Sequence, residues 1–229
     1  MKKIIIIFAI ACLSTISANA QFLYSLGVGV GASYGKELWS SEQLDTKEKY
    51  LLGFNGAVFA EFFRNPNFQW RSELMYNQLG TKEVVDGLVN SSQYINKTHY
   101  ISFDNYLKCN YPLYNWIPYF LIGPRIEYLA GRSETIFPDV IAGMPSVHVS
   151  AAAGIGISKI CYSHIKPFLE FFYNRDITPA FSGPVAPTGK SKVINNQDFE
   201  IRIGLKYVFK EKDKCPKVYN PAGNPPGAQ

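Results

Sequence analysis

The stretch FEIRIGLKYVF, residues 199–209, distinguishes between two kinds of fold. Apolar residues occupy every second position, and Glu200, Arg202 and Lys206 lie between them. Side chains of a β-strand alternate between its two faces, so this pattern predicts a strand with one apolar and one charged face. A soluble barrel would turn the apolar face inward, whereas a membrane barrel would turn it outward.

The N-terminus has the features of an export signal. Two lysines precede an apolar run at residues 4–13, and the tripeptide ANA ends at Ala20. This arrangement predicts a secretory signal peptide over residues 1–20, with cleavage before Gln21. The apolar run is too short to span a bilayer as a helix. A lipoprotein signal ending at Cys12 is the alternative, but AIAC lacks the leucine expected three residues before such a cysteine.

Composition limits the function classes. Cleavage would remove two of the 23 basic residues and none of the 18 acidic ones, leaving a formal charge of +3. So mild a charge gives no reason to expect a nucleic-acid partner. The remaining length fits one all-β domain. No apolar run of about 18 residues follows the signal, so no transmembrane helix is expected.

Eight strand-like runs alternate with connections of two lengths. The runs occupy residues 22–34, 51–63, 67–79, 98–109, 117–129, 146–158, 166–176 and 197–209. Short connections alternate with long polar ones near residues 35–50, 80–97, 130–145 and 177–196. Tight turns at one end and large loops at the other are typical of outer-membrane barrels. The sequence therefore predicts an all-β fold, an eight-stranded antiparallel up-and-down transmembrane β-barrel over residues 21–209, with both termini periplasmic.

Charged side chains lie on the polar faces of these strands. They are Glu61, Arg71, Glu73, Asp104, Lys108, Arg125, Glu127, Glu170, Glu200, Arg202 and Lys206. Facing lipid, each would cost roughly 2–4 kcal/mol near the midplane, and together they would exceed the ~5–15 kcal/mol stability of a typical protein. We therefore expect these residues to form a lumen charge network. An eight-stranded barrel is only just wide enough for side chains, which favours a salt-bridged plug over an ion path.

A lipocalin-like soluble barrel would fit the same alternation with its faces exchanged. Glycines on the charged faces favour the membrane barrel, because they suit a narrow lumen. Aromatic residues near strand ends on the apolar faces also favour it, as do the alternating loop lengths. Two strands are less regular, since Phe59 falls on the polar face and Asn105 on the apolar face.

The run CNYPLYNWIPYFLIGPRIEYLAG and the last two strands resemble small outer-membrane barrels called porin-family or PorT-like proteins. PYFLIGP, residues 118–124, matches their apolar PYxxxGP strand, and Phe209 matches their final aromatic residue. The resemblance covers residues 21–209 and implies a barrel without specifying an activity. This chain departs from the pattern by continuing past Phe209. Residues 210–229 are rich in Pro and Gly, and we expect a flexible periplasmic tail.

His148 and Ser150 are the sharpest candidates for chemistry. Two residues apart on a strand, they point the same way, and His-x-Ser resembles outer-membrane lipid A deacylases, in which the histidine would activate the serine. Glu170 is the nearest acid that could orient the histidine. Because the pair faces the predicted lumen, out of reach of a lipid, we expect a polar pair in the barrel mouth and no enzymatic activity.

The remaining histidines and cysteines suggest no cofactor. His99 and His164 lack ligand spacing to another His, Cys or acid, so no metal is expected. Cys109, Cys161 and Cys215 would all lie at the periplasmic end. Because the periplasm is oxidising, we predict that Cys215 pairs with Cys161 or Cys109, with free thiols as the alternative.

These features predict a non-enzymatic scaffold in the outer membrane that presents external loops. Its expected partners are outer-membrane lipid and an envelope protein within a larger assembly. One alternative is a lipid A-modifying esterase that uses His148 and Ser150. Another is a narrow conduit for small solutes.

Overall fold

The computed structural model describes residues 22–40, 46–86, 91–113, 116–132, 146–159, 164–185 and 190–209. The described residues do not include the predicted signal peptide or the C-terminal tail, so both stay predictions. They also do not include Cys161 and Cys215. Within these ranges no helix is long and apolar enough to cross a membrane.

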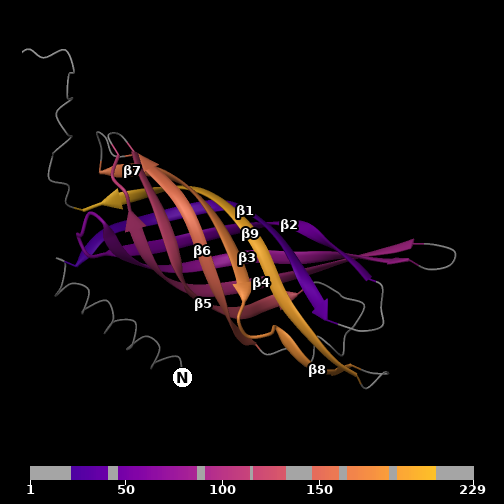
Figure 1. Cartoon of the computed structure of the whole chain (residues 1–229). Coiled ribbons are helices and arrows are strands. Elements are labelled where there is room, and N and C mark those ends of the chain that lie inside the picture. The colour runs from indigo at the N-terminus through magenta and orange to yellow at the C-terminus, as the bar shows by residue number, and fades with distance from the viewer. Residues whose placement is uncertain are drawn as a thin grey trace, which may run out of the picture.

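The described residues form a sheet of nine antiparallel strands. They are β1 (Leu23–Ser40), β2 (Thr46–Phe62), β3 (Phe68–Asp86), β4 (Ser91–Asn110), β5 (Trp116–Arg132), β6 (Val147–Lys159), β7 (Ile165–Asp176), β8 (Phe181–Val185) and β9 (Lys190–Val208). The order is β1-β2-β3-β4-β5-β6-β7-β9-β8, and β1 also pairs with β9, which closes the barrel (Figure 1). The predicted eight-stranded barrel is confirmed, with β8 as a short extra strand beside the first residues of β9.

The two ends of the barrel differ. The end where β1 begins and β9 finishes carries the short connections, and we call it the turn end (Figure 1). In the turn between β2 and β3, Asn65 Oδ1 accepts a hydrogen bond of 2.9 Å from the Asn67 N–H, as in an Asx-turn. Phe63 has a φ of 67°, and its N–H donates to the Phe22 carbonyl at 2.8 Å. The opposite end, from which long hairpins project, is the hairpin end.

At the hairpin end the strands continue beyond the predicted boundaries. β3 and β4 remain paired as far as Asp86↔Ser91, so most of the polar connection expected at residues 80–97 is β-structure. The connections expected at residues 35–50 and 177–196 are likewise partly strand. The prediction of loops at these residues was wrong. It relied on apolar alternation to recognise strands, and a strand needs that alternation only where one of its faces meets lipid. Backbone pairing continues through polar residues beyond that region.

Large apolar side chains cover the outer face. Val30 is 64% exposed, Ile155 61% and Ile203 60%. The same face of these and other strands carries Val28, Phe54, Val58, Leu74, Phe103, Ile126 and Leu205. Aromatic residues border these side chains, among them Trp70 and Tyr207. A face of this kind requires a hydrocarbon solvent, so the chain is a transmembrane barrel and the soluble alternative is wrong.

Glycines on the lumen face leave room for aromatic rings. A Cβ atom added to Gly27 would lie 2.2 Å from the ring of Phe59, and one on Gly154 would lie 2.5 Å from Phe172. The same relation holds, at 2.4 Å in each case, for Gly156 with Tyr119 and for Gly204 with Phe168. The glycines therefore determine where bulky rings can lie inside the narrow barrel.

The two irregular positions have local explanations. Phe59 is 4% exposed and lies inside the barrel, with the Arg71 guanidinium 3.5 Å from its ring centre. Asn105 points outward, where its Oδ1 accepts a hydrogen bond of 2.8 Å from Ser72 Oγ. Trp70 Nε1 donates to the same hydroxyl at 3.2 Å. Hydrogen bonding among these three side chains reduces the cost of placing amide and hydroxyl groups on the apolar face.

Candidate functional site

All members of the lumen charge network are buried, as the sequence predicts. None of the eleven residues is more than 5% exposed, and Arg71, Arg125 and Arg202 are among the largest fully buried side chains. Ten of the eleven form three groups along the barrel axis, and Glu127 lies beyond them with His148. Because an isolated buried charge is costly, the arrangement of opposite charges in each group is what makes this interior stable.

The group nearest the turn end is centred on Glu61. Its Oε1 binds Lys108 Nζ, and its Oε2 lies 3.0 Å from Lys206 Nζ. Ser25 Oγ donates a hydrogen bond of 2.7 Å to the same Oε2 atom. Strands β1, β2, β4 and β9 thus converge on one carboxylate.

The middle group crosses the lumen from wall to wall. Arg71 Nη1 lies 2.5 Å from Glu170 Oε1, and Arg71 Nη2 lies 2.6 Å from Glu73 Oε2. Arg202 Nη1 binds the other oxygen of Glu73. Tyr119 donates a hydrogen bond of 2.7 Å to Glu170. This chain joins β3, β5, β7 and β9 through the centre of the barrel.

Aromatic rings lie against the cations of the first two groups. The Arg202 guanidinium is 4.1 Å from the ring centre of Phe172, and Lys108 Nζ is 3.9 Å from that of Tyr119. Contacts at these distances are attractive cation–π interactions, and they are stronger in a desolvated site. The rings accommodated by the glycines therefore also stabilise the buried charges.

The third group lies toward the hairpin end and is centred on Arg125. Its Nε lies 3.0 Å from Asp104 Oδ2, and its Nη1 lies 2.8 Å from Glu200 Oε1. Two amides also donate to that Glu200 oxygen, Asn174 at 2.8 Å and Asn77 at 3.2 Å. Glu200 therefore accepts from three donors that belong to three different strands.

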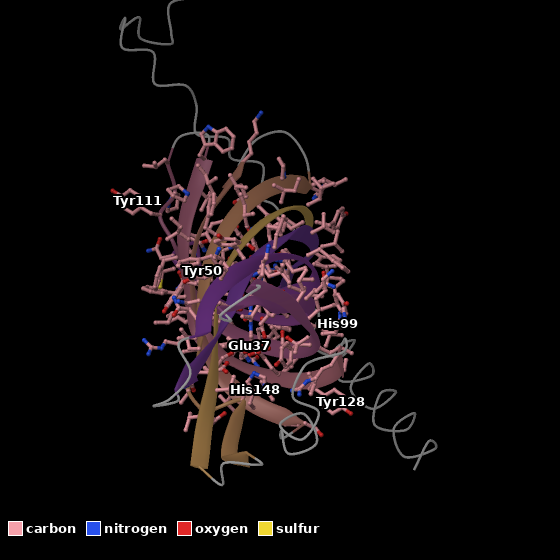
Figure 2. The ribbon with its side chains drawn as sticks, turned by 90° about the vertical axis from the view of Figure 1, so that its right-hand side faces the viewer. Glu37, Tyr50, His99, Tyr111, Tyr128 and His148 are labelled. Atoms are coloured by element: carbon pink, nitrogen blue, oxygen red, sulfur yellow. The ribbon has the colours of Figure 1, made fainter. Side chains whose placement is uncertain are left out.

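Beyond the third group lies a set of residues that we call the mouth cluster: Glu127, His148, Ser150 and Asp176. Glu127 and His148 are directly opposite each other on β5 and β6, and Asp176 is opposite Ser150 on β7. His148 Nε2 lies 3.1 Å from Glu127 Oε2 and 3.5 Å from Asp176 Oδ1. Figure 2, viewed from the side on which the hairpins project, shows His148 within the barrel outline and Tyr128 at its periphery.

The predicted histidine–serine pair does not form a hydrogen-bonded dyad. Ser150 Oγ donates instead to Glu127 Oε2, at 2.8 Å. Glu170, the nearest acid in the sequence that could have oriented the histidine, binds Arg71 and Tyr119 and pairs in register with Gly156, far along the strand from His148. It therefore lies deeper in the barrel, at the level of the middle group, and does not contact the histidine.

Asp176 is the member of the mouth cluster that sequence reasoning missed. The β6–β7 hairpin has a short connection, and continuing its antiparallel register from the turn brings Asp176 opposite Ser150. Strand register is set by the turn and the side-chain pattern, so the connection length was the signal that could have identified this residue.

The remaining candidates lie elsewhere. His99 Nδ1 is 2.6 Å from the Tyr76 hydroxyl, and His164 Nδ1 is 2.9 Å from the Val208 carbonyl oxygen. Cys109 is half-buried with a free thiol, opposite Phe120 on the neighbouring strand. Its predicted disulfide involves cysteines outside the described residues and stays a prediction.

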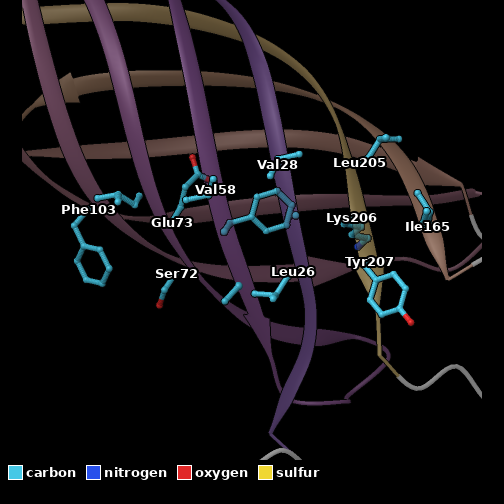
Figure 3. A pocket seen from close by; sticks show the side chains of 14 residues that line it. Leu26, Val28, Val58, Ser72, Glu73, Phe103, Ile165, Leu205, Lys206 and Tyr207 are labelled. Atoms are coloured by element: carbon cyan, nitrogen blue, oxygen red, sulfur yellow. The ribbon is translucent and has the colours of Figure 1, made fainter. Parts of the chain in front are cut away.

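The outer face also carries a shallow apolar hollow (Figure 3). It extends over β9, β1, β2 and β3, and its lining includes Leu26, Val58, Leu74 and Leu205. Ala60 and Ser72 also line it, and it belongs to the apolar outer face of the barrel.

Comparison with known proteins identifies the fold. No protein-family model matches the chain, and no curated protein sequence matches it. The crystal structure of the outer-membrane protein OprG from Pseudomonas aeruginosa is 14% identical, with 83% of this chain and 98% of OprG covered and a TM-score of 0.55. For Neisserial surface protein A (NspA), the identity is 14%, the coverage 80% and 97%, and the TM-score 0.44.

A third similar structure is Ail, the attachment invasion locus protein of Yersinia pestis, in complex with the heparin analogue sucrose octasulfate. It is 13% identical, with 80% of this chain and 99% of Ail covered and a TM-score of 0.40. The likeness to OprG shows that this chain has the fold of the small outer-membrane β-barrels. It does not support the PorT-like resemblance specifically.

Proposed function

We propose that this chain is a non-enzymatic scaffold of the outer membrane that holds its projecting hairpins outside the cell for an envelope protein partner. The observation that supports this role best is the filled lumen. The ion-paired side chains of Arg71, Arg125 and Arg202 cross it and are at most 1% exposed. A barrel filled in this way offers a rigid support and no path for a solute.

The length of the strands supports the proposal that the hairpins are held outside the cell. β3 contains 19 residues, whereas a tilted strand needs about 9–11 residues to cross a bilayer. Much of the paired β3–β4 hairpin therefore extends beyond the membrane at the hairpin end. With both termini in the periplasm, as we propose, this hairpin projects to the exterior, where a rigid barrel can present it for binding.

A conductance measurement tests the filled lumen. The purified full-length protein, inserted in a planar lipid bilayer, should give no discrete conductance steps. A matched variant with Arg71, Glu73 and Arg202 all replaced by serine removes the middle group and should conduct. Reproducible steps from the wild-type protein would establish the narrow conduit and contradict the scaffold.

The esterase alternative requires a separate assay. An esterase would need His148 to accept the Ser150 proton, whereas that hydroxyl donates to Glu127. We therefore expect no release of fatty acid from lipid A by the wild-type protein. Release that disappears in Ser150→Ala, with folding unchanged, would establish the enzyme and contradict our proposal.

The partner is tested by removing the hairpin. A variant in which residues 82–95 are replaced by a two-residue turn should fold and insert as the wild type does. Chemical cross-linking in native membranes should join a protein to the wild-type chain and not to this variant. Identical cross-linked products from the two chains would show that the β3–β4 hairpin is not the binding element.

A further inference from the structure

We propose that Glu127, His148 and Asp176 form a binding site for a divalent transition-metal ion in the barrel mouth. One nitrogen and two carboxylate oxygens, one from each residue, all lie within 4.8 Å of one another. Imidazole and carboxylate are the ligands that Zn²⁺ and related ions take in proteins. The three residues come from three consecutive strands of the barrel, which hold them in place without a metal.

The two distances from the histidine nitrogen to the carboxylate oxygens fit a metal site, and the two carboxylates offer oxygens within 4.8 Å of each other. Zn²⁺ binds histidine nitrogen at about 2.0–2.1 Å and carboxylate oxygen at about 2.0–2.2 Å, so tetrahedral ligands lie about 3.3 Å apart. His148 Nε2 is 3.1 Å from Glu127 Oε2 and 3.5 Å from Asp176 Oδ1. A metal ion can therefore bind between these atoms with only small side-chain movements.

His148 provides an independent observation that points to a ligand. The residue is 4% exposed, and its buried Nε2 atom lies 3.1 Å from Glu127 Oε2 and 3.5 Å from Asp176 Oδ1 without a well-oriented hydrogen bond to either. A buried nitrogen that faces two carboxylates in this way needs a proton or a metal ion between them. A metal ion would accept its lone pair and complete the site.

The two buried carboxylates of the cluster are offset by nearby cations. The side chains of Glu127 and Asp176 are 4% and 1% exposed. Two guanidinium groups oppose their charge: Arg125, which Asp104 and Glu200 bind, and Arg132 at the end of β5. Metal binding therefore depends on coordination by the three ligands and not on an excess of negative charge.

Hydrogen bonds from groups that are not ligands themselves hold the ligands in position. Ser150 Oγ donates to Glu127 at 2.8 Å, and the backbone N–H of Asn196 donates to Asp176 Oδ2 at 2.6 Å. Fixed carboxylates of this kind are usual around metal ligands, and outer hydrogen bonds contribute to affinity. The Asn196 bond leaves the other oxygen of Asp176 directed toward His148.

Isothermal titration with ZnCl₂ tests the site on the folded full-length protein in detergent micelles. We expect saturable binding of a single ion per chain, which His148→Gln abolishes. His99→Gln is the matched control, since it removes a histidine outside the mouth cluster and should leave binding unchanged. Ser150→Ala should weaken binding about 10–100-fold, as loss of an outer hydrogen bond does elsewhere.

Absence of saturable zinc binding by the wild type would overturn the proposal and would indicate a plain ion pair between imidazolium and carboxylates. Equal zinc binding by the wild type and His148→Gln would also overturn it. Zinc absorption-edge spectroscopy of the wild type gives an answer even if that variant misfolds. It should show imidazole and oxygen ligands. A sulfur shell at about 2.3 Å would assign the metal to cysteines and equally contradict the site.

Discussion

At the scale of single residues, the barrel interior depends on shared partners. Glu73 accepts from both Arg71 and Arg202, and all three side chains are at most 1% exposed. Removing one member of such a set costs more than the interaction itself contributes, because the remaining charges stay buried. The sequence predicted the set from alternation alone, since lipid excludes these residues from the other face.

Replacing Glu73 tests this dependence. Glu73→Ala leaves Arg71 with Glu170 alone and leaves Arg202 with only the longer contact to Glu200, so it should lower the free energy of unfolding by about 3–5 kcal/mol. Urea unfolding of the protein in lipid vesicles, followed by tryptophan fluorescence, measures the loss. The control is Lys159→Ala at an exposed position of β6, which should change stability by less than about 0.5 kcal/mol. Equal effects of the two substitutions would mean that the lumen charges do not stabilise the barrel.

The glycines allow a test of the same interior without changing a charge. A Cβ atom on Gly27 would lie 2.2 Å from the Phe59 ring, whereas one on Gly56 would have its nearest contact at 3.9 Å. Gly27→Ala should therefore destabilise the barrel by about 1–3 kcal/mol through overpacking. Gly56→Ala, on the outer face, should be tolerated. The same unfolding measurement compares them, and an unaffected Gly27→Ala would show that the ring moves freely.

At the scale of strands, one element changes its surroundings along its length. β4 carries Ile101 and Phe103 on the outer face opposite β3 residues Tyr76 and Leu74, but its first half is polar and belongs to the projecting hairpin. Sequence alternation identified only the lipid-facing half. The polar half of β4 could not be predicted as a strand from its sequence. A strand in water forms its backbone hydrogen bonds without requiring apolar residues at alternate positions.

The position of the membrane along these strands can be tested with a charge. Ile203→Arg places a guanidinium on the outer face and should cost roughly 2–4 kcal/mol, with impaired insertion. Ile95→Arg makes the same change on a residue that is 50% exposed in the projecting hairpin, and insertion should remain normal. The heat-dependent shift in gel mobility measures the inserted fraction. Normal insertion of Ile203→Arg would contradict the assignment of the faces.

At the scale of the whole molecule, the barrel follows from its sequence more directly than its candidate site does. The same apolar alternation and the same pattern of connections recur in every hairpin of the chain. A wrong interpretation of one strand is therefore corrected by the neighbouring strands when their number, order and lipid-facing sides are predicted. The mouth cluster has no such redundancy. Glu127, His148 and Asp176 are distant in sequence and meet only through two strand registers. An error of one pair in either register would have separated them.

Closure through β1 and β9 has a consequence for biogenesis. The first strand of the chain pairs with the last, in a register that begins at Ser25↔Val208. Until β9 arrives, both β1 and β7 have unpaired backbone edges, which are prone to pair with other chains. Contacts this distant in sequence also form slowly. The unfinished barrel therefore needs protection until β9 is in place, and a chain truncated before residue 190 would lack the strand that joins these two edges.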